Sequence, residues 1–188
     1  MTNRVRFGLK NVHYAVATTD TSTGVITYGT PARFPGAVSL TLDTRGDTSE
    51  FYADDTTYYT TSTNNGYEGT YEVAEIPLDF RTTVLGEQIS VDGIITETVN
   101  DRISPIALMF EFNGDVRSTR HVLYNVTMTR PSISGETTTD TSEPQTSELT
   151  FVASSGNGGA VKRSTSATTD ETIYNTWYGT VYEPVETP

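Results

Sequence analysis

Cysteine is absent from the 188 residues of this chain. Without cysteine there is no disulfide framework, no thiolate metal site and no thiol nucleophile. Many small secreted folds depend on disulfides, so their absence favours a protein that works in a reducing compartment.

Long hydrophobic runs are also missing. The first twenty residues, MTNRVRFGLKNVHYAVATTD, contain no apolar stretch typical of a signal peptide. No segment approaches the roughly 18 apolar residues that predict a membrane-spanning helix. We therefore expect a chain that is made and folded in a cytosol and has no membrane partner.

Positive charge is scarce. The chain has 12 lysines and arginines against 24 acidic residues, which gives a net charge of −12. A protein that grips duplex DNA usually carries a basic patch, and the sequence shows none of any size. The composition still permits a protein that surrounds DNA without holding it, because repulsion between like charges fades over about 8 Å at physiological salt.

Aliphatic residues nearly vanish between residues 43 and 73. Five tyrosines dominate the segment together with threonine, aspartate, asparagine and glycine: Tyr52, Tyr58, Tyr59, Tyr67 and Tyr71. Tyrosine and threonine favour strands, and Asn64-Asn65-Gly66 predicts a hairpin turn. Such a segment is poor core material, whereas tyrosine is enriched at protein interfaces. We interpret residues 43–73 as a projecting hairpin whose tyrosines meet a partner subunit; the alternative is a solvent-exposed ribbon whose rings lie on their own sheet.

The strongest pattern runs from Pro105 to Pro131. Two segments alternate strictly between apolar and polar positions, as half-buried strands do, and Asn113-Gly114-Asp115 between them predicts a turn. We place this hairpin at the centre of the fold. The predicted core residues are Leu108, Phe110, Phe112, Val122, Tyr124, Val126 and Met128, together with Trp177 from a final strand expected over residues 172–181.

Further alternating segments predict more strands along the chain. In residues 4–16 the phase of alternation flips, which predicts a bulge or bend near Asn11. One helix is expected over Glu75–Gly86, with Pro77 in its first turn and Gly86 at its C-terminal cap. Together these features predict a single, mainly β domain over residues 1–188: a two-sheet β-sandwich or barrel-like fold with one short flanking helix, long polar loops at 131–148 and 154–171, and a polar tail at 183–188.

Catalytic and metal-binding patterns are weak. His13 and His121 each lie inside a strand pattern, and they form no readable triad or ligand pair. Asp54-Asp55 does not match the spacing of a calcium loop. The loop around Lys162 lacks the glycine that a phosphate-binding loop needs before its lysine. We therefore predict no enzyme, no metal and no cofactor.

Three blocks of the sequence carry a family likeness. They are IPLDFRTTVLGE at 76–87, RHVLYNVTMTRPSISGETTTDTSEPQT at 120–146 and TTDETIYNTWYGTVYE at 168–183. Together with FGLKNVHYAVAT near the N-terminus, they resemble the major tail proteins, or tail-tube proteins, of long non-contractile-tailed phages (siphophages) of Gram-positive bacteria. The likeness spans nearly the whole chain, and residues 43–73 are its weakest part.

The resemblance implies a structural role. Tail-tube proteins are β-sandwich subunits that form rings of six, and the rings stack into a hollow tube through which DNA is ejected. The implied partners are copies of the same chain, the tape-measure protein, and the tail-terminator and distal tail proteins; genomic DNA would pass through the lumen without specific binding. The implied location is the virion tail, assembled in the host cytoplasm.

A second hypothesis is a β-sandwich module of a virion that binds carbohydrate or a cell surface. It requires an aromatic platform in a groove, and Tyr52 to Tyr71 are the residues that keep it open. A glycosidase is a third and weaker hypothesis, since carboxylate pairs can be judged only from distances.

Overall fold

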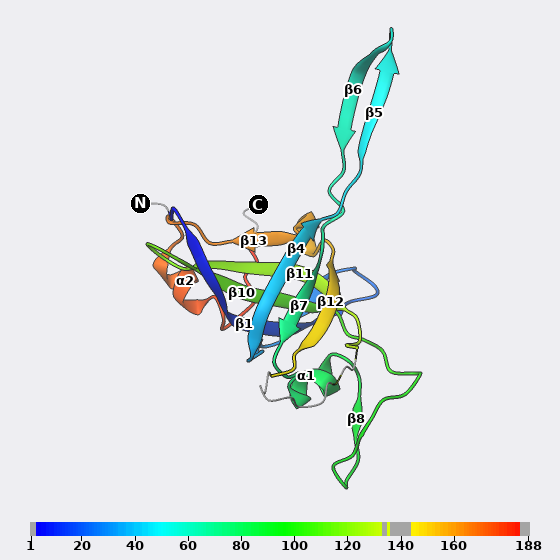
Figure 1. Ribbon diagram of the computed structural model, residues 1–188, viewed down its shortest axis with the longest axis vertical. Coiled ribbons are helices and arrows are strands. Elements are labelled where there is room, and N and C mark those ends of the chain that lie inside the picture. The colour runs from blue at the N-terminus through cyan, green and yellow to red at the C-terminus, as the bar shows by residue number, and fades with distance from the viewer. Residues whose placement is uncertain (1–2, 133–134, 136–143, 185–188) are drawn as a thin grey trace.

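The computed structural model describes residues 3–132, 135 and 144–184, and it is dominated by antiparallel strands (Figure 1). Its strands are β1 (Arg6–Thr19), β2 (Ile26–Tyr28), β3 (Ala32–Arg33), β4 (Ala37–Thr44), β5 (Thr48–Ala53), β6 (Thr56–Ser62), β7 (Tyr67–Val73), β8 (Gln88–Ile89), β9 (Ile95–Thr96), β10 (Ile106–Gly114), β11 (Thr119–Met128), β12 (Ser147–Ala153) and β13 (Lys162–Ser164). The helices are α1 (Leu78–Thr83), the 3-10 turn η1 (Asn157–Gly159) and α2 (Glu171–Thr176).

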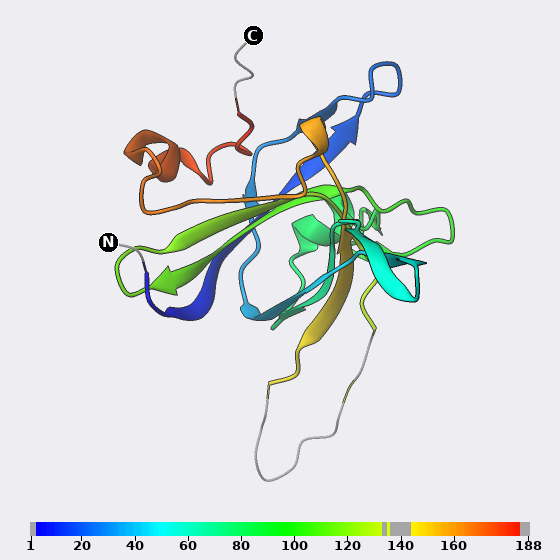
Figure 2. The same ribbon diagram turned by 90° about the horizontal axis from the view of Figure 1, so that it is seen from above.

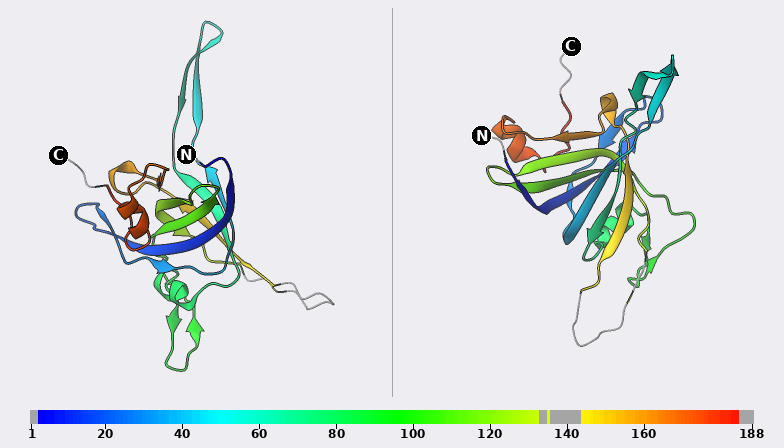
Figure 3. Two further views of the ribbon diagram at one scale, coloured as in Figure 1. Left: turned by 90° about the vertical axis from the view of Figure 1, so that its left-hand side faces the viewer. Right: turned by 45° about the horizontal axis from the view of Figure 1, so that its top comes forward.

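One large sheet forms the body of the protein. Its main strand order is β2-β1-β10-β11-β12-β7-β4, with β3 paired to β1 and β13 paired to β11. The sheet curls strongly, as Figure 2 and the two views of Figure 3 show, and β4 comes back close to β1. The mainly β, barrel-like fold predicted from the sequence is confirmed.

The predicted central hairpin is β10–β11. Leu108, Phe110, Val126 and Met128 point into the curl of the sheet and are fully buried, while Phe112 near the end of β10 is partly buried. The other face of these strands is also covered. Met109, Val122 and Tyr124 form a second apolar cluster with Trp177, which belongs to the C-terminal segment, defined here as residues 171–184. The expectation that these strands are only half-buried is therefore wrong, because a segment far along the chain covers their outer face.

Helix α1 lies at one end of the curled sheet, within the predicted range 75–86 but shorter than it. Phe80 and Val84 are fully buried, and the Phe80 ring packs 4.9 Å from the ring of Tyr14, centroid to centroid. Gly86 follows the helix with a φ of 82°, the left-handed conformation typical of a helix end. The helix therefore contributes to the main core.

The predicted final strand over residues 172–181 is wrong. The chain forms helix α2 there, and then runs on without regular structure. Asp170 caps the helix, because its carboxylate accepts a hydrogen bond from the backbone N–H of Thr172 at 2.8 Å. Ile173 and Trp177 are four residues apart, a spacing that fits one face of a helix as well as alternate positions of a strand.

The predicted bend in the first strand is confirmed. The register between β1 and β10 shifts between Lys10 and His13, and Asn11 has a φ of 51°. Asparagine tolerates this conformation better than most residues, and its side-chain amide donates to the Glu111 carboxylate at 2.9 Å.

The two predicted loops have different outcomes. Most of the loop at 131–148 lies outside the described residues, as do residues 185–188 of the C-terminal tail. The loop at 154–171 contains β13, which pairs with β11 through His121, Val122 and Leu123. Its central part is therefore a strand of the main sheet.

Two projections leave the body in opposite directions (Figures 1 and 3). The longer one is the β5–β6 hairpin. The shorter one is the β8–β9 arm, defined here as residues 88–99, whose exposed side chains include Ile89, Val91, Ile94 and Val99.

Candidate functional site: a projecting aromatic hairpin

The β5–β6 hairpin is a two-stranded ribbon that stands away from the sheet (Figure 1). Its strands pair from Thr48 opposite Ser62 to Ala53 opposite Thr56. The tip is Asp54-Asp55, with φ values of 52° and 58°. Positive φ at both central residues is typical of a type I′ turn, whose twist matches that of the two strands it joins. The hairpin therefore turns at Asp54-Asp55, and the predicted turn at Asn64-Asn65-Gly66 is wrong.

Large aromatic side chains on this ribbon are exposed. Tyr58 is 74% exposed, and Phe51, Tyr52 and Tyr59 are each exposed by more than half. Phe51 lies directly opposite Tyr59 across the two strands. Phe51 is not among the interface residues predicted from the sequence. Its position beside Tyr52 in the same aliphatic-poor segment could have indicated it.

Nothing else in the described part of the chain covers these rings. A single two-stranded hairpin is at best marginally stable in water, and exposed aromatic rings cost solvation free energy. Burying one large apolar side chain contributes roughly 1.5–3 kcal/mol. Several rings on one ribbon therefore offer a large gain to any partner that encloses them.

The structure separates Tyr67 and Tyr71 from the hairpin. Both lie on β7, which pairs with β4 and β12 in the main sheet. Tyr71 is fully buried and its ring packs 5.0 Å from that of Phe34, so its selection as a surface contact is wrong. Tyr67 is partly buried, with the Lys162 ammonium 4.4 Å from the centre of its ring. The projecting part of residues 43–73 is thus limited to the ribbon between β4 and β7.

The base of the hairpin is well tied. Arg45 and Gly66 are joined by a backbone hydrogen bond of 2.9 Å, and Asn65 donates back to the carbonyl of Arg45 at 2.8 Å. Gly66 has a φ of 97°, and a Cβ there would meet the carbonyl oxygen of Ala153 at 2.0 Å. Only glycine fits at this close approach. The ribbon therefore leaves the sheet at a fixed point.

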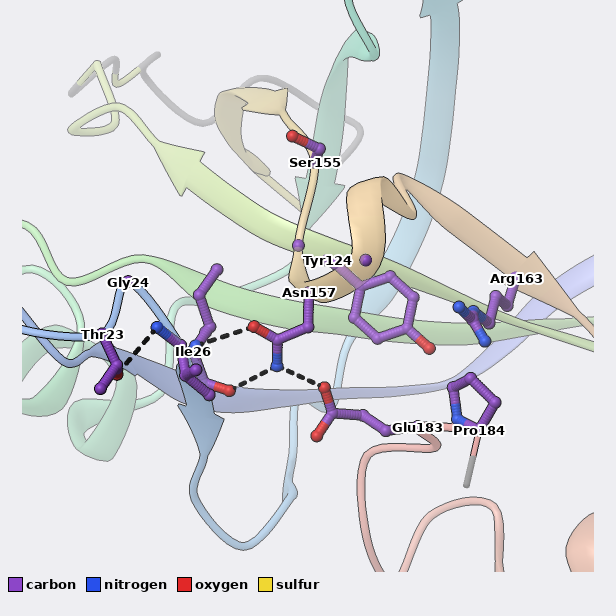
Figure 4. A pocket seen from close by; sticks show the side chains of 12 residues that line it. Thr23, Gly24, Ile26, Tyr124, Ser155, Asn157, Arg163, Glu183 and Pro184 are labelled. Carbon is purple, nitrogen blue, oxygen red and sulfur yellow. Dashed lines mark hydrogen bonds between the residues drawn. The ribbon is translucent and has the colours of Figure 1, made fainter. Parts of the chain in front are cut away.

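A groove of about 660 Å³ lies elsewhere, between β2, the η1 turn and the C-terminal segment (Figure 4). The Asn157 amide accepts a hydrogen bond from Ile26 N–H at 2.8 Å, and donates to the Ile26 carbonyl at 2.7 Å and to Glu183 at 2.6 Å. Tyr124 is the aromatic residue in its lining, but it is almost fully buried and its hydroxyl donates to the Tyr182 carbonyl. This groove offers no exposed platform on which a sugar ring could stack.

The two histidines sit in different places in the sheet. His13 stacks on Tyr178 with ring centres 4.4 Å apart, and its Nδ1 lies 2.8 Å from the carbonyl oxygen of Asn11. His121 is buried and stacks on Phe110 at 5.1 Å. Burial, and then the nearby charges of Lys162 and Arg6, lower the pKa of His121 to about 4. Neither imidazole pairs with a carboxylate of any described residue in the way a general base would.

Among the residues that the structure describes, no three histidine, cysteine or acidic side chains gather to hold a metal ion. Within 3–132, 135 and 144–184, no helix is long and apolar enough to span a bilayer.

No protein-family model matches the chain, and no curated protein matches it significantly. Several solved structures have a similar backbone. An anti-feeding prophage cap matches with 12% identity and a TM-score of 0.49, over 87% of this chain and 94% of its own. A sheath-tube complex of an extracellular contractile injection system matches with 11% identity and a TM-score of 0.48, again over 87% of this chain and 94% of its own.

A third structure, an anti-feeding prophage baseplate, gives 9% identity and a TM-score of 0.49, over 89% of this chain and 99% of its own.

Proposed function

We propose that this chain is a structural subunit of a phage tail tube and that it assembles with copies of itself. The observation that carries the proposal is the β5–β6 hairpin, an isolated ribbon of exposed aromatic rings with no surface to cover them in the described part of the chain. A monomer gains nothing from such a ribbon, whereas an assembly buries it.

The rest of the molecule fits a building block. The body is a curled sheet around a buried apolar core, and no three metal-ligating side chains gather among the described residues. The net charge of −12 suits the wall of a channel through which DNA slides, because a wall of like charge does not grip phosphate.

The finer assignment comes from the sequence resemblance. It implies the major tail protein of a siphophage of Gram-positive bacteria, in rings of six that stack into the conduit for DNA ejection. We propose the virion tail as its location, with assembly in the host cytoplasm. The proposed partners are the tape-measure, tail-terminator and distal tail proteins.

The test is direct observation of assembly. Purified protein is concentrated stepwise, followed by sedimentation velocity, and imaged by negative-stain electron microscopy. We expect monomers at low concentration and rings or tubes at high concentration. A chain that stays monomeric throughout would overturn the proposal, and glycan-array binding would favour the carbohydrate hypothesis instead.

A further inference from the structure

The charge on the β5–β6 hairpin has one sign. Asp47, Glu50, Asp54 and Asp55 are acidic, and residues 46–62 contain no lysine or arginine. All four acidic residues are exposed, as are the rings of Phe51 and Tyr58 on the same ribbon. A surface that covers this ribbon therefore needs both apolar area and positive charge.

The segment 3–9 at the beginning of β1 has both properties. Arg4 and Arg6 are exposed, and neither forms an ion pair with any residue that the structure describes. Val5 and Phe7 alternate with them and are about half exposed, at 49% and 57%. The Arg4 N–H donates a hydrogen bond to the Asp115 carboxylate at 3.0 Å, which leaves the Arg4 guanidinium without an ion-pair partner among the described residues.

Residues 3–9 are held by hydrogen bonds and border two surface depressions. The Asn3 amide donates to the Arg117 carbonyl at 2.5 Å and accepts from the N–H groups of Val116 and Arg117 at 3.1 and 3.0 Å. A depression of about 300 Å³ is lined by Arg6, Phe7, Gly8, Leu9 and Phe112. A second, of about 370 Å³, adjoins it along Asn3, Arg4, Val5, Arg6 and Thr119. We call residues 3–9 with Phe112 and Thr119 the arginine surface.

The hairpin does not cover the arginine surface of its own chain. In Figures 1 and 2 the beginning of β1 and the hairpin lie on different sides of the body, and the hairpin points away from it. A contact between them must therefore join two copies. Because the two surfaces differ, the contact is head-to-tail and can repeat from copy to copy into a ring.

We propose that the acidic, aromatic β5–β6 hairpin of one copy docks on the arginine surface of a second copy. This inference rests on the proposed function and names the surface that receives the hairpin. Carboxylates of the ribbon pair with Arg4 and Arg6, and its rings cover Val5, Phe7 and Phe112. Complementary charge of this kind fixes the orientation of partners and excludes wrong ones. Two arginines beside one aspartate are too few for a duplex-DNA footprint.

Charge exchange tests the contact. One variant carries Asp47→Lys and Glu50→Lys, a second carries Arg4→Glu and Arg6→Glu, and a third carries all four changes. Each of the first two places like charges together, so we expect the concentration for half-maximal assembly to rise about tenfold or more. In the third variant the charges are opposite again, and we expect a return to within about threefold of the unchanged chain.

The outcomes separate this inference from the proposed function. If the two pairs of changes have no effect, or if the combined variant shows no recovery, the arginine surface is not the receptor, although assembly of the unchanged chain still supports the tube. If the unchanged chain never assembles, both proposals fall. If Arg4→Glu/Arg6→Glu lowers retention of DNA and leaves assembly intact, the surface binds nucleic acid and the inference is wrong.

A crosslink guards against variants that misfold. Because the chain has no cysteine, single cysteines report only the chosen positions. Chains with Tyr58→Cys are mixed with chains with Phe7→Cys and treated with a short bis-maleimide. We expect a mixed crosslinked dimer, while Val91→Cys, which is even more exposed than Tyr58 and lies on the β8–β9 arm, gives none with Phe7→Cys. Crosslinking of Val91→Cys to the same extent would contradict the proposal.

Discussion

Arg120 donates a hydrogen bond from its Nε to the carboxylate of Glu111, over 3.0 Å, where the carboxylate is only 2% exposed. The same guanidinium lies 3.8 Å from the ring centre of Tyr174 and donates to the Tyr174 carbonyl. The Tyr178 hydroxyl donates to Glu111 at 3.1 Å. The Arg120–Glu111 pair therefore holds the C-terminal segment against the outer face of β10 and β11.

Removing the cation should loosen that segment. Arg120→Ala leaves a buried carboxylate with Lys10 as its remaining cation, 3.4 Å away and half exposed. We expect the free energy of unfolding to fall by roughly 3 kcal/mol, because a buried charge that loses its partner is costly. Denaturant titration measures the loss. The matched control is Arg130→Ala, whose pair with Glu97 is exposed and should cost less than about 1 kcal/mol.

The pH dependence of stability should carry the signature of His121. Its pKa is about 4 in the folded chain, below the value of 6.5 for a free histidine. The unfolded state therefore binds a proton first as the pH falls. The free energy of unfolding is therefore unaffected by the titration of His121 above pH 6.5, and it falls by about 3 kcal/mol as the pH drops from 6.5 to 4.

The comparison variant for this prediction is His121→Phe, which keeps a ring against Phe110. Chemical denaturation at pH 7 and pH 4 should show a smaller loss of stability for the variant than for the unchanged chain. Equal losses would mean that His121 is not held neutral by the fold.

The hairpin rings should matter for assembly and not for the monomer. Replacing Tyr52, Tyr58 and Tyr59 with threonine removes exposed rings and should change the free energy of unfolding by no more than about 0.5 kcal/mol each. The assembly concentration should rise roughly thirtyfold or more, as expected when interface hot spots are truncated. Sedimentation velocity measures the change in assembly, and unfolding curves of the same sample measure the change in monomer stability.

Tyr71→Phe is the matched control for the hairpin variant. The Tyr71 hydroxyl is buried and has no hydrogen-bond partner among the described residues, so its removal should leave both folding and assembly intact. Unfolding of the monomer by loss of the three hairpin rings would place them in the core.

Phe110 tests the central hairpin. Its side chain is fully buried in the main core, so Phe110→Ala should destabilise the chain by roughly 3–5 kcal/mol. Thermal unfolding measures the change. A loss below about 1 kcal/mol, the size typical of a surface site, would contradict the position of β10 in the core.

Gly69 tests the packing of β4 on β7. A Cβ at Gly69 would meet the carbonyl oxygen of Thr41 at 2.0 Å and the ring of Phe151 at 3.0 Å. Gly69→Ala should therefore separate the two strands and cost about 1–3 kcal/mol. Gly29→Ala is the control, because its nearest contact would be an ordinary 3.6 Å.

Local patterns predicted the parts of the fold in which neighbouring residues decide the structure. The alternation of residues 105–131, the helix around Phe80 and the bulge at Asn11 follow from side-chain period and backbone conformation. The pattern failed over residues 172–181, where a spacing of four residues between Ile173 and Trp177 fits helix and strand alike. The hydrogen bond from Thr172 to Asp170 favours the helix.

The candidate site was predicted only in part. The tyrosine-rich composition indicated a projecting segment, but composition does not say which rings face the core, and Tyr71 does. The arginine surface could not be predicted at all, because Phe7 and Phe112 are more than a hundred positions apart and only the pairing of β1 with β10 brings them together.

Thr44 and Tyr67 are register partners in the main sheet, so the ribbon begins and ends at a single point. The body therefore does not depend on the length of what lies between them. A longer, shorter or foreign ribbon can be inserted at this junction without changing the strand order of the main sheet, so residues 45–66 could be exchanged to alter which partner the ribbon contacts.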